Sequence, residues 1–265
     1  MADSIGKVTL AGAGPGDAEL ITVRLQRRLA GAQVIIVDRL VNPDIIQQFA
    51  SPAVKVIFAG KQGYNDASFS QQEVTALIIA ESLSGKSVLR LKGGDVAFFS
   101  NVLDELEALR AHEIPFEIIP GITAASGASA FAGIPLTARG YAQGVQFITF
   151  NPNSYYSPDR WKCLATTNDT LVFYMAAKNI NDLAELMLRY SRKPNTPMAV
   201  IEQATTIHQR IHLSTLRDCA KDFAAIGFSS PSLVIVGEVV TLHRQFDWFD
   251  AGREQGTIFN ELISK

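Results

Sequence analysis

A glycine-rich turn at residues 12–17 (GAGPGD) directly follows the apolar stretch 8–11 (VTLA) and has the composition of a ligand site. Glycine lacks a Cβ atom, so backbone amides in such a turn can approach a bound cofactor closely. A dinucleotide-binding fingerprint would need its third glycine where Asp17 stands, and it does not usually contain a proline such as Pro15. The turn therefore indicates a cofactor site of another kind.

Asp38 directly follows a second apolar stretch, residues 34–37 (VIIV). The carboxyl ends of parallel strands share one edge of a sheet, where open α/β sheets hold ligands, so we expect Asp38 beside the glycine turn. There its carboxylate is a candidate general base or a ligand of a ribose. The alternative is a structural role, in which Asp38 caps a turn or pairs with Arg39.

A second glycine pair, Gly93 and Gly94, stands between Lys92 and Asp95 just after the stretch 88–91 (VLRL). Two strand-terminal glycine loops on one sheet edge can clamp a flat cofactor through main-chain contacts, although such a pair also occurs in ordinary tight turns. Lys61 likewise follows a candidate strand, so its ammonium group is within reach of the same edge. The alternative for Lys61 is a solvated surface lysine.

A run of small residues at 123–130 (TAASGASA) has the pattern of a helix that begins near Thr123. Small side chains allow a ligand to approach closely, whereas the structural alternative is a helix that packs tightly on the sheet with Thr123 as its cap. His208 and His212 lie four residues apart on a predicted strand, which would separate their rings by about 13 Å at ~3.3 Å per residue. That spacing argues against a zinc site, and we expect no metal.

Short apolar runs rich in β-branched residues recur along the chain and predict two sheets. In the first half they alternate with helical patterns and are apolar on both faces, which is typical of a parallel sheet covered by helices on two sides. These expected strands are residues 8–11, 34–37, 54–58, 88–91 and 116–119. In the second half some runs follow one another with no helix between them, which favours a mixed sheet. The expected strands there are residues 145–150, 171–175, 199–202, 209–214 and 233–236.

Glycines and polar stretches predict where helices and domains end. Helices at 22–30 and 70–83 are followed by Gly31 and Gly85, which favours a left-handed turn at each helix end. Further helical patterns and one exposed loop are expected at residues 181–190, 216–225 and 151–159. We expect an N-terminal α/β domain, a C-terminal α/β domain and a tail that packs on the body or on a second subunit, at residues 1–121, 122–245 and 246–265.

The overall composition limits the classes of function. The 265 residues carry 24 basic and 26 acidic side chains and a formal charge of -2, so no overall field attracts the chain to nucleic acid or to anionic lipid. Cys163 and Cys219 are too few for a disulfide framework, which favours a reducing compartment. The first residues show no secretory pattern, and no apolar run reaches the ~18 residues of a membrane helix. We therefore expect a cytoplasmic protein that acts on neither nucleic acid nor membranes.

Several motifs, in order, resemble those of the tetrapyrrole methylase superfamily, and the similarity covers about residues 6–243. They are GAGPGD at 12–17, VDRLV at 37–41, AGK at 59–61, RLKGGD at 90–95, PGITAASG at 120–127, AGIPLTARGYAQ at 132–143 and TLVFYM at 170–175. The resemblance implies two α/β domains with S-adenosylmethionine in the cleft between them, and a homodimer. It also implies methylation of two pyrrole carbons of uroporphyrinogen III, giving precorrin-2 through precorrin-1 at the head of sirohaem and cobalamin synthesis, with S-adenosylhomocysteine as the other product.

The resemblance implies roles for individual residues. By motif match the cofactor-binding positions are Pro15, Gly93, Gly94, Asp95, Phe98, Thr123, Ala124, Met175 and Ala204, the last of which stands where the family usually has glycine. Asp38 and Lys61 fall at the positions of the family's proposed proton acceptor and proton donor. Carbon methylation leaves a cationic ring that must lose a proton, which a carboxylate within hydrogen-bond reach can accept. Arg39 and Arg139 are candidates to bind the substrate's carboxylates through their guanidinium groups.

Departures from the family pattern bear on the substrate. After GGD the family usually continues with proline and a glycine-rich acidic stretch, whereas residues 96–101 (VAFFSN) stand here. Ala138 and Gly140 replace residues that are more often His and Asp. The alternatives to the expected activity are a sister methylase that acts on a later corrin intermediate, a nicotinamide-dependent oxidoreductase, and a non-catalytic tetrapyrrole-binding module.

Overall fold

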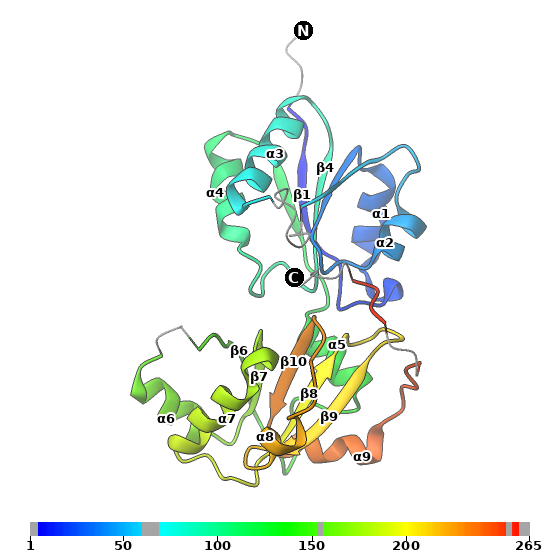
Figure 1. Ribbon diagram of the computed structural model, residues 1–265. Coiled ribbons are helices and arrows are strands. Elements are labelled where there is room, and N and C mark those ends of the chain that lie inside the picture. The colour runs from blue at the N-terminus through cyan, green and yellow to red at the C-terminus, as the bar shows by residue number, and fades with distance from the viewer. Residues whose placement is uncertain (1–4, 60–68, 153–155, 253–255, 260–265) are drawn as a thin grey trace. The chain divides into compact units, whose positions relative to one another are not determined.

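The computed structural model describes residues 5–59, 69–152, 156–252 and 256–259. The chain divides into two compact units, one formed by Met1–Ala124 with Gly256–Lys265 and the other by Ala125–Gln255. Each unit is built around a five-stranded sheet (Figure 1). Within the described ranges, no helix has the length and the apolar character needed to span a membrane.

The first unit contains a parallel sheet with the strand order β3-β2-β4-β1-β5. Its strands are β1 (Val8–Gly12), β2 (Val34–Val37), β3 (Lys55–Phe58), β4 (Val88–Lys92) and β5 (Phe116–Ile119). β1, β2 and β4 are buried along their whole length, which explains why β1 and β2 are mostly apolar, whereas β4 also contains two buried cations, Arg90 and Lys92. The prediction of a parallel sheet in the first half is confirmed.

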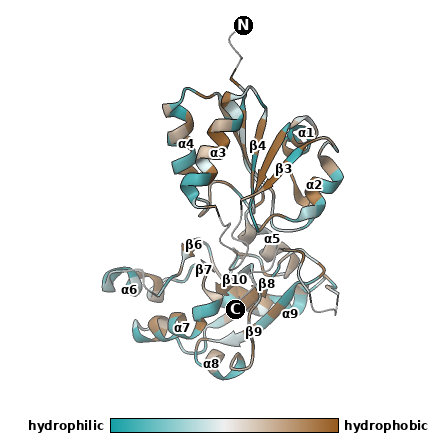
Figure 2. Ribbon diagram, turned by 45° about the horizontal axis from the view of Figure 1, so that its top comes forward, coloured by the Kyte–Doolittle hydropathy of each residue, from teal (hydrophilic) through white to brown (hydrophobic). Residues whose placement is uncertain are grey.

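Helices cover both faces of this sheet (Figure 1). They are α1 (Val23–Gly31), α2 (Pro43–Phe49), α3 (Gln71–Leu83) and α4 (Val102–Ala111), with a short 3₁₀ helix, η1 (Ala18–Leu20), before α1. Successive side chains of β2 point to opposite faces, so Ile35 and Val37 pack with α1 and α2, whereas Val34 and Ile36 pack with α3 and α4. Figure 2 shows the result as hydrophobic colouring on β3 and β4 and mixed colouring on α3 and α4.

The two helix-terminal glycines of this unit behave differently. Gly85 has φ +84° just after α3, as predicted. Gly31 is instead the last residue of α1, and its successor Ala32 is extended, so the prediction of a left-handed turn there is wrong. The physical reason is that β2 begins within a few residues of the end of α1, and an extended backbone at Ala32 connects the two elements directly. Helices α2 and α4 were not predicted, although Asn42 caps α2 and proline begins it.

The second unit contains a mixed sheet with the strand order β6-β7-β10-β8-β9. Its strands are β6 (Val145–Thr149), β7 (Thr170–Tyr174), β8 (Pro197–Glu202), β9 (Arg210–Thr215) and β10 (Ser232–Val236). β6 and β7 are parallel, whereas β10 is antiparallel to both β7 and β8, and β9 is antiparallel to β8. The prediction of a mixed sheet is therefore confirmed.

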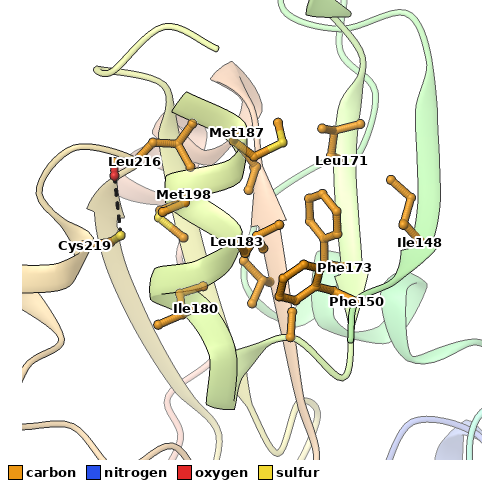
Figure 3. Close-up of a cluster of buried hydrophobic side chains, with 14 of the residues drawn as sticks. Ile148, Phe150, Leu171, Phe173, Ile180, Leu183, Met187, Met198, Leu216 and Cys219 are labelled. Carbon is orange, nitrogen blue, oxygen red and sulfur yellow. Dashed lines mark hydrogen bonds between the residues drawn. The ribbon is translucent and has the colours of Figure 1, made fainter. Parts of the chain in front are cut away.

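A large apolar core fills one side of the second sheet (Figure 3). Leu183 and Met187 of α7 lie against Phe173 of β7, and the Cys219 thiol donates to Leu216 O at 3.5 Å. Burial raises the pKa of the Cys219 thiol, so it is a packing residue. The helical elements of this half are α5 (Ala124–Phe131), α6 (Pro158–Thr166), η2 (Ala177–Asn179), α7 (Ile180–Arg189), α8 (Cys219–Asp222), η3 (Glu238–Leu242) and α9 (His243–Phe246).

Two predictions for the second half need correction. The helix expected over residues 216–225 is confined to α8, because Asp218 donates its backbone N–H to Thr215 Oγ1 and so lies in a turn. The exposed loop expected over 151–159 ends earlier, since Ser157 caps α6 and Pro158 begins it. A serine cap followed by proline at the first helical position is a recognisable signal for the start of a helix.

The tail beyond α9 packs on the second unit. The ring of Phe131 lies 5.2 Å from that of Trp248, and Trp248 Nε1 donates to Ala130 O at 2.8 Å. The tail was expected to pack either on the body of the protein or on a second subunit, and this part of it packs on the body.

Candidate active site

The loops after β1 and β4 bind each other through their backbones. Gly14 N donates to Gly94 O at 3.1 Å, and Gly94 N donates to Gly14 O at 2.8 Å. Both glycines have positive φ, +79° and +68°, a conformation that a side chain would strain. Because β1 and β4 are neighbours, the two glycine loops identified in the sequence come together at the carboxyl edge of the first sheet.

Asp95 joins a third loop to this pair. Its Oδ2 accepts a hydrogen bond from Gly121 N at 2.8 Å, and its Oδ1 accepts one from Ala97 N at 2.6 Å. The loops pack so closely that a Cβ on Gly12 would lie 2.5 Å from Gly94 O and 2.8 Å from Gly121 N. The carboxylate of Asp95 therefore holds the loops together, and a ligand at this position would contact the backbone of Asp95.

The other cofactor-binding positions expected in the first unit lie on the same three loops. Pro15 is buried within the loop after β1. Gly93 and Phe98 lie on the loop after β4, where Phe98 is 39% exposed. Thr123 and Ala124 follow β5 and are partly buried. Since β4, β1 and β5 are adjacent in the sheet, these positions share one edge of the unit.

Asp38 directly follows β2, and its backbone N–H donates to a carbonyl of β4 at 3.1 Å. Its carboxylate pairs with Arg90 and not with Arg39. The side chain is 34% exposed, so one part of the carboxylate is held by the protein and another is open. Two residues further on, Leu40 packs against the second glycine loop, where a Cβ on Gly93 would lie 2.7 Å from Leu40 O. The structure thus places Asp38 beside the glycine loops.

Behind Asp38 lies a buried charge network on β4 and α4. Arg90 Nε and Lys92 Nζ each lie 3.0 Å from Glu105 Oε1, and all three side chains are nearly or wholly buried. Lys92 Nζ also donates to Ser100 O at 2.6 Å, which anchors the loop after β4. Within the described residues, the second oxygen of Glu105 accepts no hydrogen bond. The network therefore links the Asp38 carboxylate to the loop that carries Phe98.

Burial also affects the ionisation of this network. It lowers the pKa of Lys92, and the nearby Glu105 carboxylate opposes that change. Roles for Arg90, Lys92 and Glu105 were not predicted from the sequence. A signal was present for Arg90, because a cation in a strand predicted to be buried on both faces requires a buried counter-charge.

The other cations expected at the site belong to different parts of the chain. Arg39 is partly buried next to Asp38, and burial lowers the pKa of its guanidinium group. Arg139 belongs to the second unit and is exposed in a tight turn closed by hydrogen bonds between Ala138 and Ala142, both 3.0 Å long. Lys61 lies outside the described residues.

In the second unit, Met175 and Ala204 follow β7 and β8. Both strands are antiparallel to β10, so their carboxyl ends share one edge of the sheet. Met175 comes just after the last residue of β7, with φ +60° and a 66% exposed side chain. Ala204 is buried between Gln203 and Thr205, which have φ +44° and +68°. Non-glycine residues in this conformation cluster at ligand sites, because the strain persists only where surrounding structure enforces it.

Helix α5 holds both of these loops. Ala125 N, in the first turn of α5, donates to the phenol oxygen of Tyr174 at 3.2 Å. The buried amide of Gln209 accepts from Thr205 N at 2.8 Å and donates to Phe131 O, in the last turn of α5, at 3.1 Å. Tyr174 and Gln209 are therefore positioning side chains that the motifs did not reveal.

His212, one of the two histidines weighed as a zinc ligand, has a structural partner. Its Nε2 lies 2.6 Å from Glu202 Oε2, and the rings of Phe223 and Phe228 pack edge-on against it. Burial opposes ionisation of Glu202, but the hydrogen bond and charge of His212 and the hydrogen bonds from Ser229 together lower the pKa of that carboxyl. This pair joins β8 to β9.

The comparison with protein families agrees with this arrangement. The sequence model of the family described as Tetrapyrrole (Corrin/Porphyrin) Methylases matches residues 7–220, which is more than half of the chain and includes all the loops just described. The chain therefore belongs to the tetrapyrrole methylase family, and the expectation of an enzyme of this family and fold is confirmed.

Particular relatives narrow this class. Siroheme synthase of Pseudomonas fluorescens (strain SBW25) is 42% identical over 250 residues, which are 94% of this chain and 53% of that protein. The chain spans about half the length of the curated relatives it matches. The uroporphyrin-III C-methyl transferase of Thermus thermophilus, solved with S-adenyl homocysteine, is 32% identical with a TM-score of 0.75, covering 89% of this chain and 100% of that chain. A cobalt precorrin-4 methyltransferase, 23% identical with a TM-score of 0.79 over 88% of this chain and 95% of that chain, shares the fold.

Proposed function

We propose that this chain transfers methyl groups from S-adenosylmethionine to two pyrrole carbons of uroporphyrinogen III, giving precorrin-2 through precorrin-1. The observation that carries the proposal is that three glycine loops and a partly exposed carboxylate, Asp38, meet at the carboxyl edge of one parallel sheet. The 32% identity to the Thermus thermophilus uroporphyrin-III C-methyl transferase supports the same substrate.

The residues of the loops fit a neutral adenosine attached to a sulfonium. Main-chain groups and small side chains predominate, and two large apolar side chains at expected cofactor positions, Phe98 and Met175, remain exposed. Apolar surface beside a few main-chain hydrogen-bonding groups is suited to a flat ring system. We assign the cofactor to Pro15, Gly93, Gly94, Asp95, Phe98, Thr123, Ala124, Met175 and Ala204.

When bound, S-adenosylmethionine supplies a methyl group that its sulfonium already activates, and a reaction of this kind requires no metal. The task of the chain is to align the pyrrole carbon with that methyl group and to remove the proton that the methylated ring must lose. We assign proton removal to Asp38 and proton donation to Lys61. Arg39 and Arg139 would bind carboxylates of the substrate.

The family resemblance also supports a homodimer. The charge balance and cysteine content support our proposal that it works in the cytoplasm and binds neither nucleic acid nor membranes. The resemblance supports the division of the chain into domains at residues 1–121 and 122–245 and a tail at 246–265. The curated relatives are siroheme synthases, which supports siroheme synthesis as one route for the product, and cobalamin synthesis is the other route that the resemblance implies.

Anaerobic incubation with uroporphyrinogen III and S-adenosylmethionine tests this function. Mass analysis of the tetrapyrrole should show one added methyl group at early times and two at the end. Methylation of a later corrin intermediate but not of uroporphyrinogen III would identify a sister methylase. Binding of both compounds without any methylated product would identify a binding module.

Replacing the proposed base gives a sharper test. Asp38→Asn should lower kcat by about 100-fold or more, because positioned general bases contribute at least that much. The affinity for S-adenosylhomocysteine, measured by titration calorimetry, should stay within about twofold of wild type because Asp38 is not at an expected cofactor position. Asp104→Asn, an exposed aspartate of α4, is the matched control and should change neither quantity. Full activity of Asp38→Asn would remove Asp38 from the mechanism.

A further inference from the structure

Arg90 lies in the middle of the central strand β4, and its side chain is only 3% exposed. Removing a guanidinium group from water costs free energy unless the charge is paired and its N–H groups are hydrogen-bonded. A buried arginine in the middle of a fully buried strand is therefore kept in place by its partners. Those partners show which group the arginine holds.

The guanidinium group of Arg90 is held on several sides. Its Nε donates to Glu105 Oε1 at 3.0 Å, and its Nη1 lies 3.4 Å from two backbone oxygens, Ile36 O and Leu91 O. Its Nη2 donates to Asp38 Oδ1. Glu105 is wholly buried, so it has little freedom to move. The rigid fork of Arg90 thus transmits the fixed position of Glu105 to the carboxylate of Asp38.

Asp38 is held in this way by one oxygen only. Oδ1 receives the hydrogen bond from Arg90, whereas Oδ2 accepts none from the described part of the chain. The side chain is 34% exposed, so Oδ2 can meet a ligand. A proton acceptor must lie within hydrogen-bond reach of the proton it removes, and small errors in its position slow the reaction.

We infer that Arg90, itself fixed by Glu105, is a positioning residue that orients the open oxygen of Asp38 toward the substrate. The inference rests on the proposed function, because it gives Asp38 a proton to accept. A purely structural ion pair would require only that Arg90 and Asp38 stabilise the fold. The two interpretations differ in whether the effect of Arg90 on the rate depends on Asp38.

The test is Arg90→Lys, which keeps the charge but cannot donate to Asp38 and Glu105 in the same fixed geometry. We expect kcat to fall at least tenfold while KM for both substrates changes less than threefold. In the Asp38→Asn background, Arg90→Lys should cause no further loss beyond twofold, because its effect passes through the missing carboxylate. Arg28→Lys is the matched control, since Arg28 also pairs with a glutamate of this unit, Glu117, and should leave kcat unchanged.

A second variant covers the case in which Arg90→Lys does not fold. Arg90→Gln combined with Glu105→Gln removes one positive and one negative buried charge, so the cluster keeps its charge balance. It should show the same loss of kcat as Arg90→Lys. Normal kcat in either folded variant would overturn the inference, and so would a loss that multiplies with that of Asp38→Asn.

A crystal structure of the variant provides a readout that does not depend on activity. If Arg90 positions Asp38, the Asp38 carboxylate should occupy a different rotamer or several rotamers once the fork is gone. An unchanged, fully ordered Asp38 would overturn the inference even in an active protein. Failure of the proposed function is recognised separately, because wild-type protein would then make no methylated tetrapyrrole.

Discussion

The two ends of the parallel sheet handle buried charge in opposite ways. At the amino end, Glu81 and Glu117 are the nearly buried partners, and the lysines and arginines around them are between 41% and 62% exposed. At the carboxyl end the cations Arg90 and Lys92 are buried together with Glu105, and the most exposed member of the network is Asp38.

Under the proposed function, this difference separates a folding role from a catalytic one. Exposed cations around a glutamate are screened by water and contribute little each, so they neutralise a charge at small cost. Buried cations have a large desolvation cost and persist only where geometry requires them. The carboxyl end, where the glycine loops and Asp38 meet, is the end at which that cost is incurred.

The largest expected effect on stability comes from replacing Glu105 at the carboxyl end, which we compare with replacing Glu81 at the amino end. Glu105→Gln should lower the free energy of unfolding by about 3 kcal/mol or more, because it leaves Arg90 and Lys92 buried without their shared counter-charge. Glu81→Gln should lower it by about 1 kcal/mol or less, since Lys55 and Lys86 remain solvated. Urea unfolding at neutral pH measures both. Equal losses for the two variants would show that burial of the cations does not distinguish the two ends.

The glycines of the two ends provide a second contrast. Gly12→Ala should cost about 2 kcal/mol, because the new Cβ would lie 2.5 Å from a backbone oxygen of Gly94, which cannot move without separating the loops. Gly31→Ala, at the amino end, should stabilise the protein by about 0.5 kcal/mol, because Gly31 ends α1 with nothing within 4 Å of the added atom. Thermal and urea unfolding of both variants check the opposite signs. A neutral Gly12→Ala would mean that the loops are not tightly packed.

Local patterns were sufficient to predict most of the fold. The strand at residues 34–37 was predicted at its observed limits, because these four apolar residues have a polar residue on each side. The strand expected at 171–175 was displaced by one residue, since Met175 continues the apolar run and only the backbone shows its positive φ. Helix α4 was missed because Asn101, at its start, adopts a left-handed conformation and offers no side-chain cap.

The charge network could not be predicted from the sequence, for a different reason. Asp38, Arg90 and Glu105 lie on three separate elements, and nothing in their spacing shows that they meet. Asp38 was identified as a candidate base from its place after a strand, and the partner weighed for it was its neighbour Arg39. The observed partner comes from the adjacent strand, which becomes evident only once the order β2-β4 is known. Sequence motifs therefore reveal the loops and Asp38, whereas the ion pair between Asp38 and Arg90 becomes evident only from the tertiary structure.

The smallest expected effect concerns the pH dependence at the amino end. The hydrogen bond from Arg28, with further ones from Arg24, Lys7 and Thr9, holds the pKa of Glu117 well below its ordinary value of 4.5. A carboxyl whose pKa is lower in the folded state stabilises the fold above its unfolded pKa, and this stabilisation is lost as the pH falls through and below that value. Glu117→Gln should therefore lower the free energy of unfolding by about 1 kcal/mol at pH 7, a modest value because the cations are exposed.

That difference between wild type and Glu117→Gln should narrow progressively as the pH is lowered from about 5 to 3, which urea unfolding across this range measures. Glu107→Gln, an exposed glutamate of α4 with no ion pair in the described residues, should show no difference from wild type at either end of the range. A difference for Glu117 that stayed constant with pH would mean that its charge contributes nothing and that Gln disturbs packing alone. The amino end would then stabilise the sheet by packing, and its exposed cations would have no part in its stability.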